Sequence, residues 1–162
     1  MIDARELSAL RTQWDSGDAM RVGWVIYEAL PNAARPRLAA ELLILSCELL
    51  PGVPGEISSV IELTKDPRRW REAHDAFQNV RRLTIELLRD TPDDKVREAV
   101  LLVAENAAKV IYNASEELAP FDHDCGYWLV GCAHDLAMKA HSPELKGRFW
   151  CAMETLLGTP RS

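Results

Sequence analysis

The chain has 162 residues, of which 48% are hydrophobic and 27% are charged, and its formal net charge is −6. This length fits one domain, and the composition is that of an ordinary folded protein rather than of a disordered chain. The acidic balance disfavours nucleic acids and anionic membranes as partners, because both carry negative charge themselves.

The N-terminal stretch MIDARELSALRTQWDSGDAM is charged and amphipathic, unlike a signal peptide, which has a basic segment followed by an apolar one. No apolar run approaches the roughly 20 residues that cross a bilayer. The longest one is interrupted by Glu41 and Glu48. We therefore expect a cytoplasmic protein without membrane segments, in which the four cysteines are buried thiols.

Three helices are predicted in the first fifty residues. Asp3 and Glu6 have the spacing of a capping box for the first helix, which Gly17 ends. The second helix spans 18–30 and stops before a proline, and the third spans 36–50 between two prolines.

The second of these helices has two apolar sides. One can face the core, whereas the other, with Met20, Trp24 and Tyr27, needs a cover. Neighbouring helices could supply the cover, and so could a partner protein or a second copy of this chain. Because Trp, Tyr and Met are enriched at interface centres, we take these three residues as a candidate interaction surface.

A short helix at 56–63 precedes two long helices, at 67–90 and from Thr91-Pro92 to about residue 118. The apolar stripe of each long helix advances in alternating steps of three and four residues, as in helix pairs. The stripes are Trp70, Ala73, Phe77, Val80, Thr84 and Leu87, then Val96, Val100, Val103, Ala107, Val110 and Ala114. Because the connection is so short, we expect a central antiparallel hairpin.

Arg71, Arg82 and Arg89 share one face of the first long helix and form a possible anion-binding ridge. The alternative is a solvated face, because Asp75 and Glu86 are interspersed. No nucleic-acid reading motif accompanies the arginines, so nucleic acid is not an expected partner.

The stretch FDHDCGYWLVGCAH at 121–134 is the densest cluster of metal-binding residue types in the chain. His123, Asp124, Cys125 and His134 would form a metal or hydrolytic site if the fold brought them together. On one continuous helix, however, the two histidines lie about 16 Å apart along the axis. The preferred interpretation is therefore structural, with an aspartate as helix cap and His134 as a hydrogen-bonded, semi-buried side chain.

Two glycines interrupt this helix, Gly126 and Gly131, and they predict the close approach of a neighbouring helix. A last helix begins at Ser142-Pro143 and ends at Gly158.

These patterns predict a single all-α domain over 1–162, a bundle of seven or eight helices, with a short α-solenoid of stacked hairpins as the alternative. Common catalytic and nucleotide-binding motifs are absent, and no cofactor is expected. We expect a non-enzymatic protein-interaction module, such as an adaptor, a regulatory subunit or a toxin-neutralising inhibitor, that binds another protein or forms a homodimer. The alternative is a metal- or ligand-binding helical hydrolase with its site around His123, Asp124, Cys125 and His134.

Overall fold

The computed structural model describes residues 2–114 and 124–158, with side chains in the second range described from Tyr127 onward. The described residues form α-helices and short 3₁₀ turns and contain no strand, which confirms the all-α prediction. The helices are α1 (Ala4–Ser16), α2 (Ala19–Ala29), α3 (Arg35–Cys47), α4 (Gly55–Leu63), α5 (Glu72–Asp90), α6 (Lys95–Asn113), α7 (Asp124–Lys139) and α8 (Pro143–Leu157), with 3₁₀ turns at Asn32–Ala34 and Pro67–Arg69.

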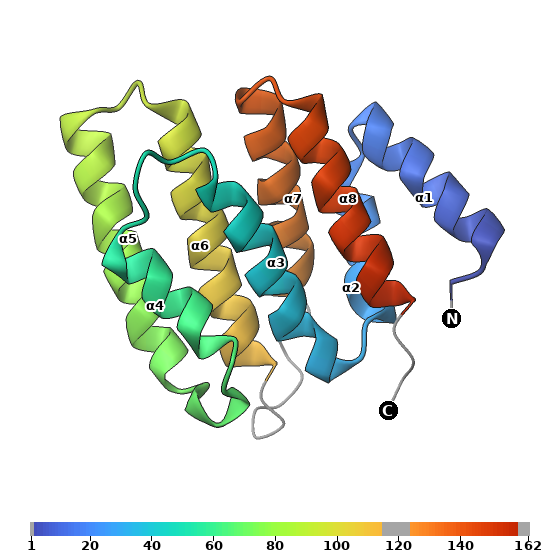
Figure 1. Cartoon of the computed structure of the whole chain (residues 1–162), viewed down its shortest axis with the longest axis horizontal. Helices are drawn as coiled ribbons and strands as arrows, with labels where there is room; N and C mark the ends of the chain where they lie inside the picture. The colour runs from blue at the N-terminus through green and yellow to red at the C-terminus, as the bar shows by residue number, and fades with distance from the viewer. Residues whose placement is uncertain (1, 115–123, 159–162) are drawn as a thin grey trace.

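The helices lie in two layers (Figure 1). One layer has the order α5, α6, α7, α2, and the other has α4, α3 and α8, with α1 beside α8 at the edge. Helix α7 packs between α6 and α2, although α2 comes about a hundred residues earlier in the chain. A solenoid of consecutive hairpins would keep α7 away from α2, so the bundle is confirmed and the solenoid alternative is wrong.

Side-chain caps mark the starts of α1, α6 and α8. The Asp3 carboxylate accepts a hydrogen bond from the Glu6 backbone N–H at 2.8 Å, as the sequence predicts. Helix α6 starts at Lys95 rather than at Thr91-Pro92, because Asp94 accepts from the Arg97 N–H at 3.1 Å. The carboxylate cap accepts a hydrogen bond from a backbone N–H that has no partner within the helix. A proline has no backbone N–H, so it does not satisfy one of these donors.

The predicted hairpin of α5 and α6 is present, and α6 is the more central of its two helices. Helix α6 contacts α3, α4, α5 and α7, whereas α5 lies at the edge of its layer (Figure 1). The described part of α6 ends at Asn113, and residues 115–118 of the predicted helix lie outside the described residues.

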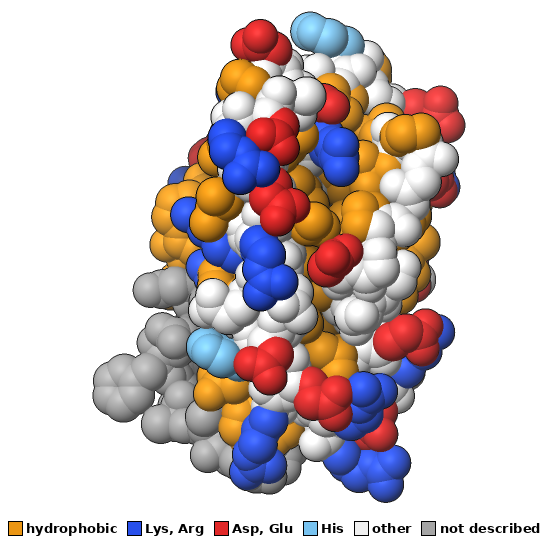
Figure 2. Space-filling model, turned by 90° about the vertical axis from the view of Figure 1, so that its left-hand side faces the viewer, with side chains coloured by type: hydrophobic (Ala, Val, Ile, Leu, Met, Phe, Trp, Pro, Cys, Tyr) orange, Lys and Arg blue, Asp and Glu red, His pale blue; other side chains and the backbone are white. Residues whose placement is uncertain are grey.

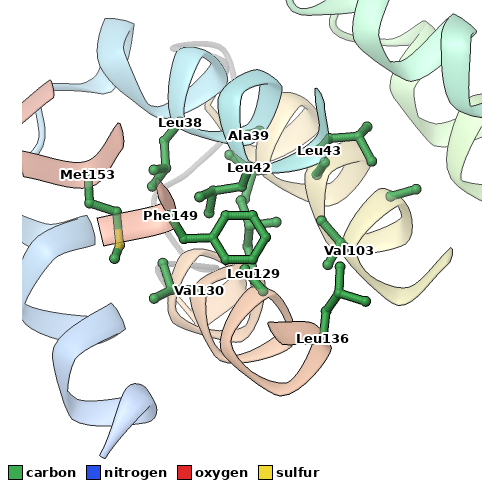
Figure 3. Close-up of a cluster of buried hydrophobic side chains, with 14 of the residues drawn as sticks. Leu38, Ala39, Leu42, Leu43, Val103, Leu129, Val130, Leu136, Phe149 and Met153 are labelled. Atoms are coloured by element: carbon green, nitrogen blue, oxygen red, sulfur yellow. The ribbon is translucent and has the colours of Figure 1, made fainter. Parts of the chain in front are cut away.

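The core lies between the two layers, where side chains from four helices interdigitate (Figure 3). The labelled residues are Leu38, Ala39, Leu42 and Leu43 of α3, Val103 of α6, Leu129, Val130 and Leu136 of α7, and Phe149 and Met153 of α8. All ten are fully buried. Each large aliphatic or aromatic side chain of this kind contributes about 1.5–3 kcal/mol on burial, so the layers are held mainly by apolar packing.

The cysteines depart in part from the prediction that all are buried. Cys47 is buried, Cys132 is half-buried and Cys151 is exposed, because it lies on the outward side of α8. Burial raises the pKa of the Cys47 thiol, and of the Cys132 thiol, to about 11. The side chain of Cys125 lies outside the described residues.

Among the described helices, none has both the length and the apolar character required to span a bilayer.

Candidate functional site

The predicted metal cluster of α7 falls largely outside the described residues. His123 is not described, and neither are the side chains of Asp124 and Cys125. The helix itself is continuous from Asp124 to Lys139. Ten residues of α-helix place His134 about 15 Å along the axis from Asp124, so their backbone positions do not converge.

The imidazole of His134 is only 7% exposed and is bonded to the first helix. Its Nε2 lies 3.2 Å from the backbone oxygen of Trp14, and the two rings meet edge to face with centroids 4.7 Å apart. Because a carbonyl oxygen only accepts, Nε2 carries the hydrogen in this contact.

Burial lowers the pKa of His134 below its ordinary value, and the positive charge of Lys146 acts in the same direction. The Trp14 carbonyl and Asp135 act in the opposite direction, and their effect is smaller than that of burial. The neutral imidazole thus fastens α1 to α7, which is the structural role that the sequence analysis preferred. Within the described parts of the chain, no three His, Cys, Asp or Glu side chains gather as metal ligands would.

The arginines of the predicted anion ridge are separately engaged or interspersed with acids. The Arg71 guanidinium lies over the Trp70 ring at 4.5 Å, and Arg89 pairs with Asp90 at 2.7 Å. Figure 2 shows positive and negative side chains mixed over this side of the molecule. An anion-binding role of Arg71, Arg82 and Arg89 stays a prediction, without a concentrated positive field to support it.

The candidate interaction surface of α2 is exposed in two of its three residues. Met20 is 40% exposed and Trp24 is 47% exposed. Tyr27 is only 1% exposed, which corrects its assignment to this surface. Its ring packs under the Arg35 guanidinium at 4.3 Å, one helical turn after Gly23, the residue of α2 that meets α7.

Helix α7 completes this surface with two aromatic side chains. Tyr127 is half-buried, and its ring centroid lies 5.8 Å from that of Trp24. Tyr127 also stacks on Trp128, with centroids 5.4 Å apart, and Trp128 is 51% exposed. Met20, Trp24, Tyr127 and Trp128 together are called the aromatic surface below.

Two glycines, Gly23 of α2 and Gly131 of α7, lie where these helices approach each other beneath the aromatic surface. A Cβ atom on Gly23 would lie 3.0 Å from the backbone oxygen of Tyr127, and one on Gly131 would lie 2.9 Å from the Met20 sulfur. The backbone contact between the helices is thus at Gly23, whereas Gly131 meets only the end of the flexible Met20 side chain, so the close helix approach predicted from Gly131 stays a prediction. Gly126 lies among the residues whose side chains are not described.

Sequence reasoning missed the two aromatic residues of α7. Trp128 lies on a different side of that helix from the buried residues. This position is the feature of the sequence that could have identified it as exposed. Only the tertiary contact of α7 with α2 shows that it continues the surface of Met20 and Trp24. The side chains of the aromatic surface are uncharged, so it suits burial against a partner better than proton transfer.

Comparison with protein-family models, with curated proteins and with solved structures found no match for this chain.

Proposed function

We propose that the protein acts by binding another protein through the aromatic surface, as an adaptor, a regulatory subunit or an inhibitor of the toxin-neutralising kind. The observation that carries this proposal is the continuous group of rings from Trp24 through Tyr127 to Trp128, two of them about half exposed. Clusters of exposed Trp and Tyr are typical of binding surfaces, because these side chains bury a large area with little loss of conformational freedom.

The energetics support a binding role for so few residues. A buried aromatic side chain covers about 150–250 Å², and burial of apolar surface contributes about 25 cal/mol per Å². Trp24 and Trp128 already have about half of their surface covered, so a partner would bury the rest. Interface hot spots, which are enriched in Trp and Tyr, cost about 2 kcal/mol or more when truncated. The chain's net charge of −6 favours a partner with a basic surface.

The hydrolase alternative has less support from the described residues. His134 is its only member with a described side chain, and that imidazole is buried and bonded to the Trp14 carbonyl. A catalytic histidine needs access to substrate, which this contact does not provide. We therefore retain the interaction module as the proposed function.

The test compares two exposed apolar-to-acidic substitutions. Trp24→Asp places a charge in the aromatic surface, whereas Ile85→Asp places one on α5, where Ile85 is 57% exposed. Sedimentation velocity measures self-association, and quantitative affinity purification measures stoichiometric partners. We expect Trp24→Asp to reduce association at least about tenfold, as for a residue worth more than 1.4 kcal/mol, and Ile85→Asp to leave it unchanged.

Circular dichroism shows whether each variant is still folded, so that loss of binding can be distinguished from unfolding. If Trp24→Asp unfolds the chain, Trp24 is part of the core and the proposed surface is wrong. If the folded wild-type protein has no stoichiometric partner and does not self-associate, or if both variants bind equally well, the proposal also fails.

A further inference from the structure

A hollow of about 330 Å³ opens between α5 and α6, away from the aromatic surface of α2 and α7. It is lined by Ala73, His74, Phe77, Ala108, Lys109, Tyr112 and Asn113. Ala73 and Ala108 come from facing helices and are fully buried. Two such small side chains leave space between the helices that larger residues would fill, and the volume is at the lower end of the range for small-molecule sites.

The walls of the hollow include aromatic side chains, and the Tyr112 ring is packed against neighbouring rings. Trp70 packs edge to face on Tyr112 at 5.1 Å, and the His74 ring lies 6.0 Å from the same tyrosine. Phe77 stands on α5 beside the same space. Half-buried rings that are already packed lose little freedom when a flat apolar group contacts them, so the walls suit a planar ring.

One positively charged side chain, Lys109, stands at the rim of the hollow. The Lys109 ammonium lies 5.0 Å from the centre of the Phe77 ring. The acid one turn earlier on α6, Glu105, is buried and accepts hydrogen bonds from Thr84 at 2.7 Å and Arg81 at 3.4 Å. Its charge is therefore paired with Arg81 rather than with Lys109.

Among the described residues, those that line the hollow include no acid, and no carboxylate forms an ion pair with Lys109. An ammonium at the rim of an apolar hollow is complementary to an anion that has an apolar body.

We propose that this hollow binds a small planar aromatic carboxylate, with its ring between Phe77 and Tyr112 and its carboxylate on Lys109. The aromatic walls select a flat apolar body, and the ammonium selects the negative charge. The polar side chains of His74 and Asn113 border the same opening. The site is independent of the aromatic surface and of the proposed protein partner.

The test uses 2-naphthoate as the probe, titrated into ¹⁵N-labelled full-length protein and followed by amide chemical shifts. The neutral isostere 2-naphthamide tests the charge, and cyclohexanecarboxylate tests the flat ring. The variant Lys109→Met removes the ammonium from an exposed position, and Lys95→Met removes one at the opposite end of α6 as the matched control.

We expect saturable shifts in α5 and α6 around the hollow. Lys109→Met and the change to naphthamide should each weaken binding by about tenfold, the typical effect of losing a hydrogen bond to a charged group. Lys95→Met should bind like the wild type. The proposal is overturned if naphthoate produces no saturable shift at millimolar concentration, if naphthamide or cyclohexanecarboxylate binds equally well, if Lys109→Met binds like the wild type, or if the shifts map to α2 and α7.

Discussion

At the scale of single residues, Gly23 lies at a close contact between α2 and α7. A Cβ atom there would lie 3.0 Å from both the Tyr127 backbone oxygen and the Val130 Cβ. The tyrosine oxygen belongs to a helix backbone and cannot turn aside as a flexible side chain would. The space at this point is therefore limited to glycine, although glycine is a poor helix former.

Gly23→Ala should consequently destabilise the protein. The helix-propensity gain of about 1 kcal/mol is smaller than overpacking of about 1–3 kcal/mol, so we expect a net loss of up to about 2 kcal/mol. Urea unfolding gives the free energy of unfolding. The control is Gly147→Ala in α8, where an added Cβ meets no atom within 4 Å and should stabilise by about 0.5–1 kcal/mol. Equal effects of the two substitutions would contradict a tight crossing at Gly23.

The buried imidazole of His134 makes stability depend on pH. Because burial lowers its pKa in the folded protein, the unfolded chain binds a proton more readily as the pH falls below the ordinary value of about 6.5. The free energy of unfolding should therefore decrease between pH 7 and pH 5.5. His134→Gln should flatten this dependence, because an amide can still donate to the Trp14 carbonyl but does not titrate.

Denaturant unfolding at several pH values measures this slope. A His134→Gln variant with the wild-type slope would show that other groups cause the pH dependence.

At the scale of elements, a buried polar group joins α5 to α6. Glu105 is 4% exposed, and Thr84 of the facing helix, 2% exposed, donates its hydroxyl hydrogen to the carboxylate. Arg81 adds an ion pair from the same helix at 3.4 Å. Because a buried carboxylate without partners is unfavourable, this contact favours one alignment of the two helices.

Thr84→Val removes the hydroxyl while keeping the shape of the side chain. We expect a loss of about 1–3 kcal/mol in the free energy of unfolding, because the carboxylate loses a donor that water cannot easily replace. Thr12→Val on α1 is the matched control: Thr12 is exposed and bonds only its own helix, so its loss should stay within about 0.5 kcal/mol. An unchanged free energy of unfolding in Thr84→Val would mean that Glu105 finds another hydrogen-bond donor.

At the scale of the whole molecule, one cluster of buried apolar residues extends from Leu10 in α1 to Leu156 in α8. Helix α7 is packed between α6 and α2, so neither half of the chain has a core of its own. The single domain over 1–162 stays a prediction, and this arrangement supports it.

A single cooperative unfolding transition is the corresponding prediction. Far-UV circular dichroism reports on all helices, and tryptophan fluorescence reports on positions from Trp14 in α1 to Trp150 in α8. The two midpoints in urea should coincide, because the shared core couples the helices. Two separated transitions, or an α1 that unfolds before the rest, would contradict one folding unit.

Much of the local structure was predictable, because its causes lie within a few residues of each other. Asp3, Gly17 and Ser142 act as predicted at the helix ends, and the alternating apolar stripes of α5 and α6 identify their buried sides. The start of α6 was wrong because Pro92 and Asp94 offered competing signals two residues apart, and the side-chain cap prevailed.

Sequence alone thus determined the helical class and most helix boundaries, since capping and periodicity are local. Only the tertiary structure decided which helices are neighbours, and with that which aromatic side chains are exposed. Tyr27 and Trp24 belong to the same amphipathic helix, yet one is buried and the other meets Tyr127 at the surface. Exposure depends on a neighbour from the far end of the chain, and no pattern within α2 encodes the position of α7.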